Sequence, residues 1–200
     1  LTICPRLSPK TQEHCRHGIC RRLIIICECL RYFFSNIPPD INREKSPREN
    51  IKANIYLHAF LINISGILDN MAWLWAYHTG LDGRFDLEKR KNRITLFGDD
   101  FEKYITHDML EIINKYSKWH EFLVHHRNPT AHRIPPYVIP YTVPNKLEKN
   151  ERIDYTPKYI HSFKSKYGII PLHAQSLADA CTVASLLDLL LNNVEALINE

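Results

Sequence analysis

Apolar residues recur every three or four positions along most of the chain, which is the period of helices that bury one face. A start signal, Ser46-Pro47, places an N-cap residue before a proline at the first helical position, and Thr79-Gly80 is a typical helix end. Within the third predicted helical stretch, residues 99–133, a break is expected near Thr106. The first predicted helix has residues 19–34 as its core, and the other predicted helical stretches cover residues 47–78, 99–133 and 176–199.

The second predicted helix is apolar nearly all round between Ile55 and Tyr77, so we expect it at the centre of the molecule. It also carries polar residues that are costly in lipid, which argues against a membrane span. The apolar run of the first helix is too short to cross a bilayer. No membrane association is therefore expected. The residues on which the membrane interpretation fails are His58, Asn63, Asp69 and Asn70.

Residues 134–170 differ from the rest because prolines interrupt them. Alternation of residue types over Tyr137–Val143 predicts extended backbone on a surface. The whole pattern predicts an all-α fold: an up-and-down bundle of four to five helices, with an extended Pro-rich insertion before the last helix. At 200 residues the chain is expected to form a single domain over 1–200.

The charge of the chain is slightly positive and unevenly distributed. Lys and Arg number 26 against 22 Asp and Glu, a formal net charge of +4. Residues 1–50 hold nine of the basic side chains and five of the acidic ones, so the excess lies in the first quarter. This asymmetry permits a polyanionic partner without requiring one.

Five of the six cysteines lie in the first 29 residues, next to His14 and His17. The cluster could supply zinc ligands, but it lacks the paired C-x2-C spacing of strong zinc sites. We favour reduced cysteines on a helix, and we expect no metal and no cofactor. The N-terminal residues show no secretory signal, so the cytoplasm is the expected location. The cysteines are Cys4, Cys15, Cys20, Cys27, Cys29 and Cys181.

The third predicted helix ends in Arg127-Asn128-Pro129-Thr130-Ala131-His132, an R-N-x3-H pattern. This pattern resembles the R-x4-6-H signature of the HEPN superfamily (higher eukaryote and prokaryote nucleotide-binding domains). The resemblance implies an all-α bundle. It also implies that two protomers pair around the motif. Many HEPN proteins are metal-independent ribonucleases, including toxins of toxin–antitoxin pairs, and others bind nucleotides or partners without catalysis.

The motif residues suit RNA transesterification, in which the 2′-hydroxyl of the substrate attacks the adjacent phosphorus. His132 would take or give a proton, and Arg127 would offset charge in the transition state. Residues five apart on a continuous helix are rotated by roughly 140°, so these two would not face one cleft. We expect the helix to kink or restart at Asn128-Pro129, which would bring the side chains together and free backbone N–H groups for a phosphate. Asn128 would orient the loop.

Other residues are weaker candidates. Asp69 could orient Arg127 or His132, or only bond a neighbouring helix. His125 and His126 could contact phosphate, although helix packing is the more common role of such histidines. Tyr137 and Tyr141 could stack on a base, although simple packing onto the bundle is favoured.

The sequence thus predicts a metal-independent endoribonuclease of HEPN type, a toxin or defence component, that cleaves RNA by 2′-hydroxyl attack. The alternative is a non-catalytic HEPN-like dimer that binds nucleotide, nucleic acid or a protein partner. The expected partners are RNA, a second copy of the chain in a homodimer, and an antitoxin or other protein.

Overall fold

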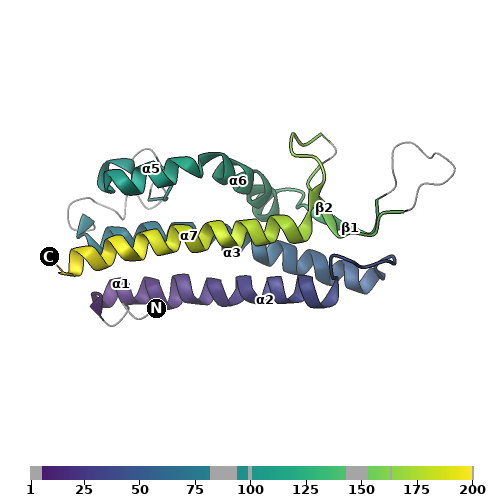
Figure 1. The fold of residues 1–200 in the computed structure, drawn as a ribbon, viewed down its shortest axis with the longest axis horizontal. Coiled ribbons are helices and arrows are strands. Elements are labelled where there is room, and N and C mark those ends of the chain that lie inside the picture. Colours follow the sequence, from purple (N-terminus) through teal and green to yellow (C-terminus); the bar gives the residue numbers. More distant parts are fainter. Residues whose placement is uncertain (1–5, 82–93, 99–100, 143–152, 163, 200) are drawn as a thin grey trace. The chain divides into compact units, whose positions relative to one another are not determined.

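The computed structural model describes residues 6–81, 94–98, 101–142, 153–162 and 164–199. The chain divides into two compact units, and the long helices contribute to both (Figure 1). The first unit contains residues 1–24, 63–121 and 181–200. The second unit contains residues 25–62 and 122–180.

Helices make up most of the described residues, which confirms the predicted all-α class. A short α-helix and a π-helix precede the first long helix, and a 3-10 turn precedes α5. The helical elements are α1 (Pro9–Glu13), η2 (His14–Cys20), α2 (Arg21–Asn36), α3 (Pro47–His78), η4 (Glu102–Tyr104), α5 (His107–Lys115), α6 (Ser117–His132) and α7 (Leu172–Asn199).

The predicted bounds of α3 are confirmed at both ends. Ser46 and Glu49 form a reciprocal capping box: Glu49 N donates to Ser46 Oγ at 3.3 Å, and Ser46 N donates to Glu49 Oε2 at 2.8 Å. The carboxylate of Glu49 also binds Arg43 at 2.6 Å. At the other end, Gly80 has a φ of +68°, a conformation that glycine adopts without strain.

Other boundaries differ from the prediction. Helical backbone begins at Pro9, capped by Ser8, and so extends ten residues before the predicted helix core of residues 19–34. The predicted break near Thr106 is confirmed, since the Thr106 side chain caps α5, and a second break at Tyr116 separates α5 from α6. The last helix begins at Leu172, four residues before the predicted Ser176.

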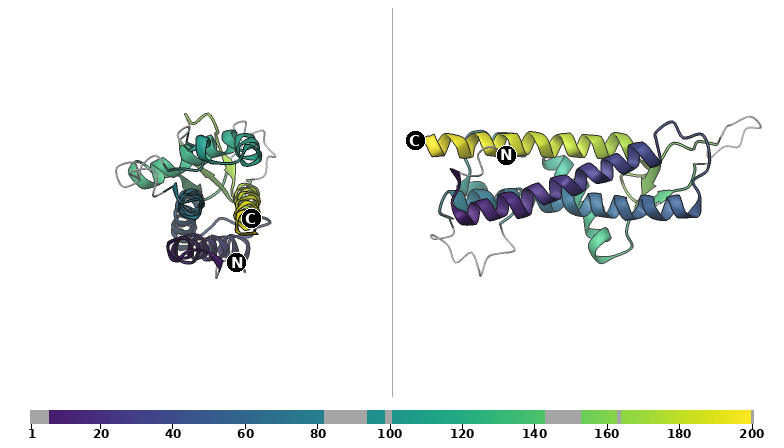
Figure 2. Two further views of the ribbon diagram at one scale, coloured as in Figure 1. Left: turned by 90° about the vertical axis from the view of Figure 1, so that its left-hand side faces the viewer. Right: turned by 90° about the horizontal axis from the view of Figure 1, so that it is seen from below.

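Helices α2 and α3 pack side by side and antiparallel, and each unit shows this on its own (Figures 1 and 2). In the second unit, Tyr32 stacks on Tyr56 with ring centroids 4.0 Å apart. In the first unit, the Arg22 guanidinium donates to the Oδ1 atoms of Asn70 at 2.8 Å and Asn63 at 3.1 Å. The interior of α3 is largely buried, as the sequence predicts for a central helix.

The second unit also contains a small antiparallel sheet of β1 (Tyr137–Ile139), β2 (Lys158–Ile160) and β3 (Ile170–Pro171), in the order β1-β2-β3. The extended backbone predicted after the motif is confirmed over β1, whereas the sheet itself was not expected. Side chains of α3 hold its edge, because Asn54 Oδ1 accepts from Val138 N at 2.8 Å and His58 Nε2 donates to Pro136 O at 2.7 Å.

By length and composition alone, α3 and α7 are each apolar enough to cross a membrane. In the most apolar window of α3, 56% is buried inside the protein, as in the core helix of a globular fold. The corresponding window of α7 is 28% buried.

Candidate functional site

A pocket of about 480 Å³ opens in the second unit, between the end of α6 and the residue that follows β2. Three imidazoles and one guanidinium line it, together with an amide and two apolar side chains. This composition suits an anionic ligand. The lining residues are Val124, His125, Asn128, Pro129, His132, Arg133 and His161.

The wall that α6 provides is an unbroken helix, so the restart predicted as one of two alternatives at Asn128-Pro129 is wrong. The other alternative, a kink at this position, stays a prediction. The helix continues through Pro129 to His132. Pro129 cannot donate to the carbonyl of His125, which costs about 3 kcal/mol in a helix interior. Here the proline side chain is buried, and Thr130 Oγ1 donates to His126 O at 2.9 Å. Packing therefore offsets the lost bond, and the predicted free N–H groups for a phosphate do not arise.

Because α6 is continuous, Arg127 and His132 lie on different sides of it. His132 is exposed and lines the pocket, whereas Arg127 does not. Arg127 is half-buried, and its Nη1 donates to Asn128 Oδ1 at 3.1 Å. Of the three motif residues, His132 and Asn128 line the pocket, and Arg127 does not line it.

Of the two neighbouring histidine candidates, His125 lines the pocket and His126 does not. His125 Nε2 lies 3.1 Å from Ser165 Oγ, and its ring meets Tyr167 edge-on at 5.0 Å. His126 is fully buried among Phe122, Tyr159 and Tyr167, and its Nδ1 donates to Phe122 O at 2.9 Å. Burial lowers the pKa of His126 to about 4, so this imidazole is neutral and serves packing.

His161 forms the wall opposite α6, directly after the central strand β2. Its ring meets the ring of His125 edge-on, with centroids 5.5 Å apart. Its Nδ1 is buried and has no hydrogen-bond partner among the residues that the structure describes. Such an atom costs free energy unless a water or a ligand completes it.

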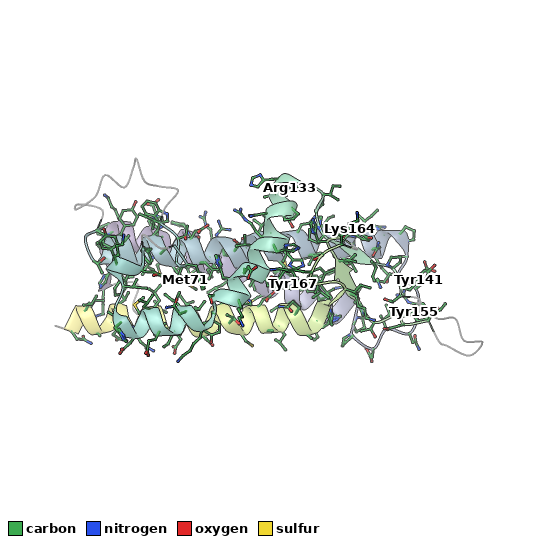
Figure 3. All side chains as sticks on the ribbon, turned by 90° about the horizontal axis from the view of Figure 1, so that it is seen from above. Met71, Arg133, Tyr141, Tyr155, Lys164 and Tyr167 are labelled. Carbon is green, nitrogen blue, oxygen red and sulfur yellow. The ribbon has the colours of Figure 1, made fainter. Side chains whose placement is uncertain are left out.

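The electrostatic character of the pocket is cationic. Arg133 stands at the end of α6, and Lys164 and Tyr167 lie on the segment between β2 and β3 in the same part of the unit (Figure 3). Among the described residues that line the pocket, none is acidic. In this unit Asp154 pairs with Lys158, which with Thr156 lowers the pKa of that carboxyl to about 2.

The remaining candidates do not line this pocket. Asp69 belongs to the first unit, whereas the pocket residues belong to the second. Tyr137 lies on β1 and Tyr141 follows it, and each is 39% exposed. The role of Asp69 in orienting a motif side chain and the roles of the two tyrosines in base stacking stay predictions.

The described cysteines of the N-terminal Cys/His cluster lie on helical backbone, and they differ in burial. Cys15 is buried in η2, Cys29 is buried in α2, and Cys27 is exposed. Burial raises the pKa of the Cys29 thiol to about 12, so this thiol is unreactive. No group of three or more metal-binding side chains gathers in the part of the chain that the structure describes, and Cys4 lies outside that part.

Comparisons with protein-family models, with curated proteins and with solved structures found no match to this chain. The site must therefore be interpreted from its own geometry. Sequence reasoning missed Arg133, which directly follows the motif, and His161, which no spacing rule connects to His132. The only signal for His161 is its position after a short apolar pair, Tyr159-Ile160, in a region otherwise interpreted as an insertion.

Proposed function

We propose that this chain is an endoribonuclease of HEPN type that cleaves RNA through its own 2′-hydroxyl, without a metal, at the pocket beside the R-N-x3-H motif. The observation that carries the proposal is the presence of His132, His161 and Arg133 around one cavity. Imidazoles move protons near neutral pH, and a guanidinium binds a phosphate oxygen. These are the two kinds of group that this reaction requires.

In the proposed reaction, the 2′-oxygen bonds to phosphorus while the bond from phosphorus to the 5′-oxygen breaks. The 2′-hydroxyl proton passes to an imidazole, and the leaving 5′-oxygen receives a proton. The products carry a 2′,3′-cyclic phosphate and a 5′-hydroxyl. His132 takes part in the proton transfers because it is exposed at the pocket.

The two arginines of this region have different roles in the proposal. Arg133 lines the pocket and binds the phosphate, where it offsets negative charge in the transition state. Arg127 acts indirectly, because its guanidinium holds the side chain of Asn128, which does line the pocket. Arg127 is thus a positioning residue.

A second candidate function is a non-catalytic HEPN-like module that binds nucleotide, nucleic acid or a protein partner. The observation that favours it is the separation of Arg127 from His132 on a continuous helix. If catalysis requires both Arg127 and His132 at one substrate, a single chain does not supply a complete catalytic site. A homodimer, an antitoxin partner and a cytoplasmic location accompany either proposal as expectations from the resemblance.

The decisive experiment is an RNA-cleavage assay in EDTA with wild type, His132→Ala and Arg127→Ala. We expect cleavage by wild type, loss of at least 100-fold in His132→Ala, and a smaller loss in Arg127→Ala. The exposed His107 on α5 offers a matched control, His107→Ala, with unchanged activity. The absence of cleavage by wild type on any RNA would favour the non-catalytic module.

A substrate with 2′-deoxyribose at the scissile position tests the reaction itself. It should survive, because the attacking hydroxyl is missing. Cleavage of that substrate, or loss of activity in EDTA, would contradict the proposed mechanism.

A further inference from the structure

His161 faces the pocket from a different part of the chain than the α6 motif. We propose that His132 and His161 are the two imidazoles that contact one phosphodiester in this pocket, and that they divide the acid and base roles of RNA cleavage. The inference rests on the proposed function and deepens it. It assigns a catalytic residue that lies 29 positions beyond the motif.

The sheet fixes the position of His161. The residue directly follows β2, the central strand, in which Ile160 pairs with Tyr137 of β1. The preceding Tyr159 is 2% exposed, and its ring meets that of the buried His126 at 5.7 Å. A side chain that follows such a strand is held in place as a catalytic group requires.

The ring of His161 is also oriented from one side. His125 packs edge-on against it, and His125 is itself held beside Ser165 Oγ. The buried Nδ1 of His161 has no partner among the described residues, although the rest of the imidazole is only half-buried. This imidazole is held by its neighbours, and its Nδ1 lacks a hydrogen-bond partner at the wall of a pocket. Such a group is suited to bind a polar ligand.

The groups that surround His161 make this ligand an anion. His125 and His132 of α6, and Arg133 directly after α6, line the same pocket, and none of the described lining residues carries a carboxylate. Tyr167 and Ser165, on the segment after β2, contact His125 rather than His161. A phosphodiester gains negative charge on its oxygens as the 2′-oxygen attacks, so this setting stabilises the transition state more than the substrate.

The pair completes the proton balance of the reaction within a single chain. One imidazole, neutral at the start, accepts the proton of the 2′-hydroxyl as the bond from the 2′-oxygen to phosphorus forms. The other, protonated at the start, donates to the 5′-oxygen as the bond from phosphorus to that oxygen breaks. No external oxidant, reductant or co-reactant is needed.

Kinetics with two substrates test the division of roles. On a dinucleotide, His161→Ala and His132→Ala should each lower kcat/KM by at least 100-fold, while His107→Ala stays within about 2-fold. Uridine 3′-(4-nitrophenyl phosphate) has a leaving group that needs no proton. On this substrate, the variant that lacks the acid should recover most of its activity, and the variant that lacks the base should not. Full dinucleotide activity in His161→Ala, or equal losses of both variants on both substrates, would overturn the pair.

Inorganic phosphate tests the same pocket without catalysis, so that failure of the pair and failure of the ribonuclease proposal can be distinguished. In the full chain, added phosphate should shift the imidazole NMR signals of both His132 and His161 and leave those of His107 in place. Shifts confined to His132 would overturn the pair even if the protein cleaves RNA. Shifts of both histidines in a wild type that cleaves no RNA would support the shared phosphate site and overturn only its catalytic use.

Discussion

Arg127 donates a hydrogen bond from Nη1 to the Oδ1 of its neighbour Asn128 at 3.1 Å, and of the two only Asn128 lines the pocket. In the proposed site this relationship gives the two motif residues separate roles: the guanidinium would position the amide, and the amide would contact the ligand. A second guanidinium, that of Arg133, lines the pocket directly. The chain therefore offers two arginines for comparison: Arg133, which lines the pocket, and Arg127, which does not.

This pair gives the first prediction. Arg133→Ala should weaken RNA binding and reduce the slope of log affinity against log salt by about 1, because one phosphate contact is lost. Arg127→Ala should leave the salt slope unchanged and lower kcat by less than 10-fold through the freed Asn128 side chain. Salt titrations of RNA binding, combined with steady-state kinetics, measure both effects. If Arg127→Ala reduces the slope of log affinity against log salt and Arg133→Ala does not, the assigned roles are contradicted.

The exposed tyrosines after the motif give the second prediction. Tyr137 and Tyr141 are each 39% exposed, so their rings are accessible to a base. Stacking of one base on an aromatic ring is worth about 1–3 kcal/mol. Tyr137→Ala or Tyr141→Ala should raise the KM for an RNA of ten or more nucleotides by 5-fold or more, yet leave the KM for a dinucleotide unchanged, because neither ring lines the pocket.

Phenylalanine variants provide the control for stacking, since Tyr137→Phe and Tyr141→Phe keep the ring. They should bind the longer RNA like wild type. Equal KM values in the alanine variants and wild type would assign both rings to packing alone.

The sequence predicts much of the helical framework because local signals determine it. The Ser46 cap and Gly80 mark the ends of α3, and both act within a few residues of the chain. The continuity of α6 could not be predicted, because the penalty of Pro129 is local whereas the burial that offsets it comes from tertiary packing. His161 was missed for the same reason, since its place at the pocket depends on the pairing of β2 within the sheet.

The buried imidazole of His126 gives the third prediction, on stability against pH. Its pKa is lowered to about 4 in the folded state, whereas an unfolded histidine has a pKa near 6.5. Between these values the unfolded state binds more protons, so the free energy of unfolding falls as pH decreases from 6.5 to 4. This difference in pKa corresponds to a change of about 3 kcal/mol in the free energy of unfolding. The burial-lowered pKa values of His14, His120 and His173 act in the same direction.

Urea unfolding at several pH values, with His126→Leu as the variant, isolates this contribution. The slope of stability against pH should be smaller in His126→Leu than in wild type, and the exposed control His107→Ala should match wild type. Identical slopes in His126→Leu and wild type would show that His126 is not buried in its neutral form.

The fourth prediction concerns a close approach between α2 and α3 in the first unit. A Cβ built on Gly66 would lie 2.4 Å from Cζ of Arg22, so glycine at this position makes room for the guanidinium. That guanidinium bonds Asn63 and Asn70, and moving it would cost about 1–2 kcal/mol in lost hydrogen bonds to buried or half-buried amides. Without such a clash, alanine stabilises a helix interior by roughly 0.5–1 kcal/mol over glycine.

A double-mutant cycle distinguishes these two terms. Gly66→Ala should lower the free energy of unfolding in the wild-type background. The same substitution should raise it in an Arg22→Ala background, where the space is free. Urea unfolding of the four proteins gives the coupling energy directly. If Gly66→Ala has the same effect in both backgrounds, Arg22 does not occupy the surface of α3 at Gly66, and the polar contacts between α2 and α3 in this unit must differ from those described.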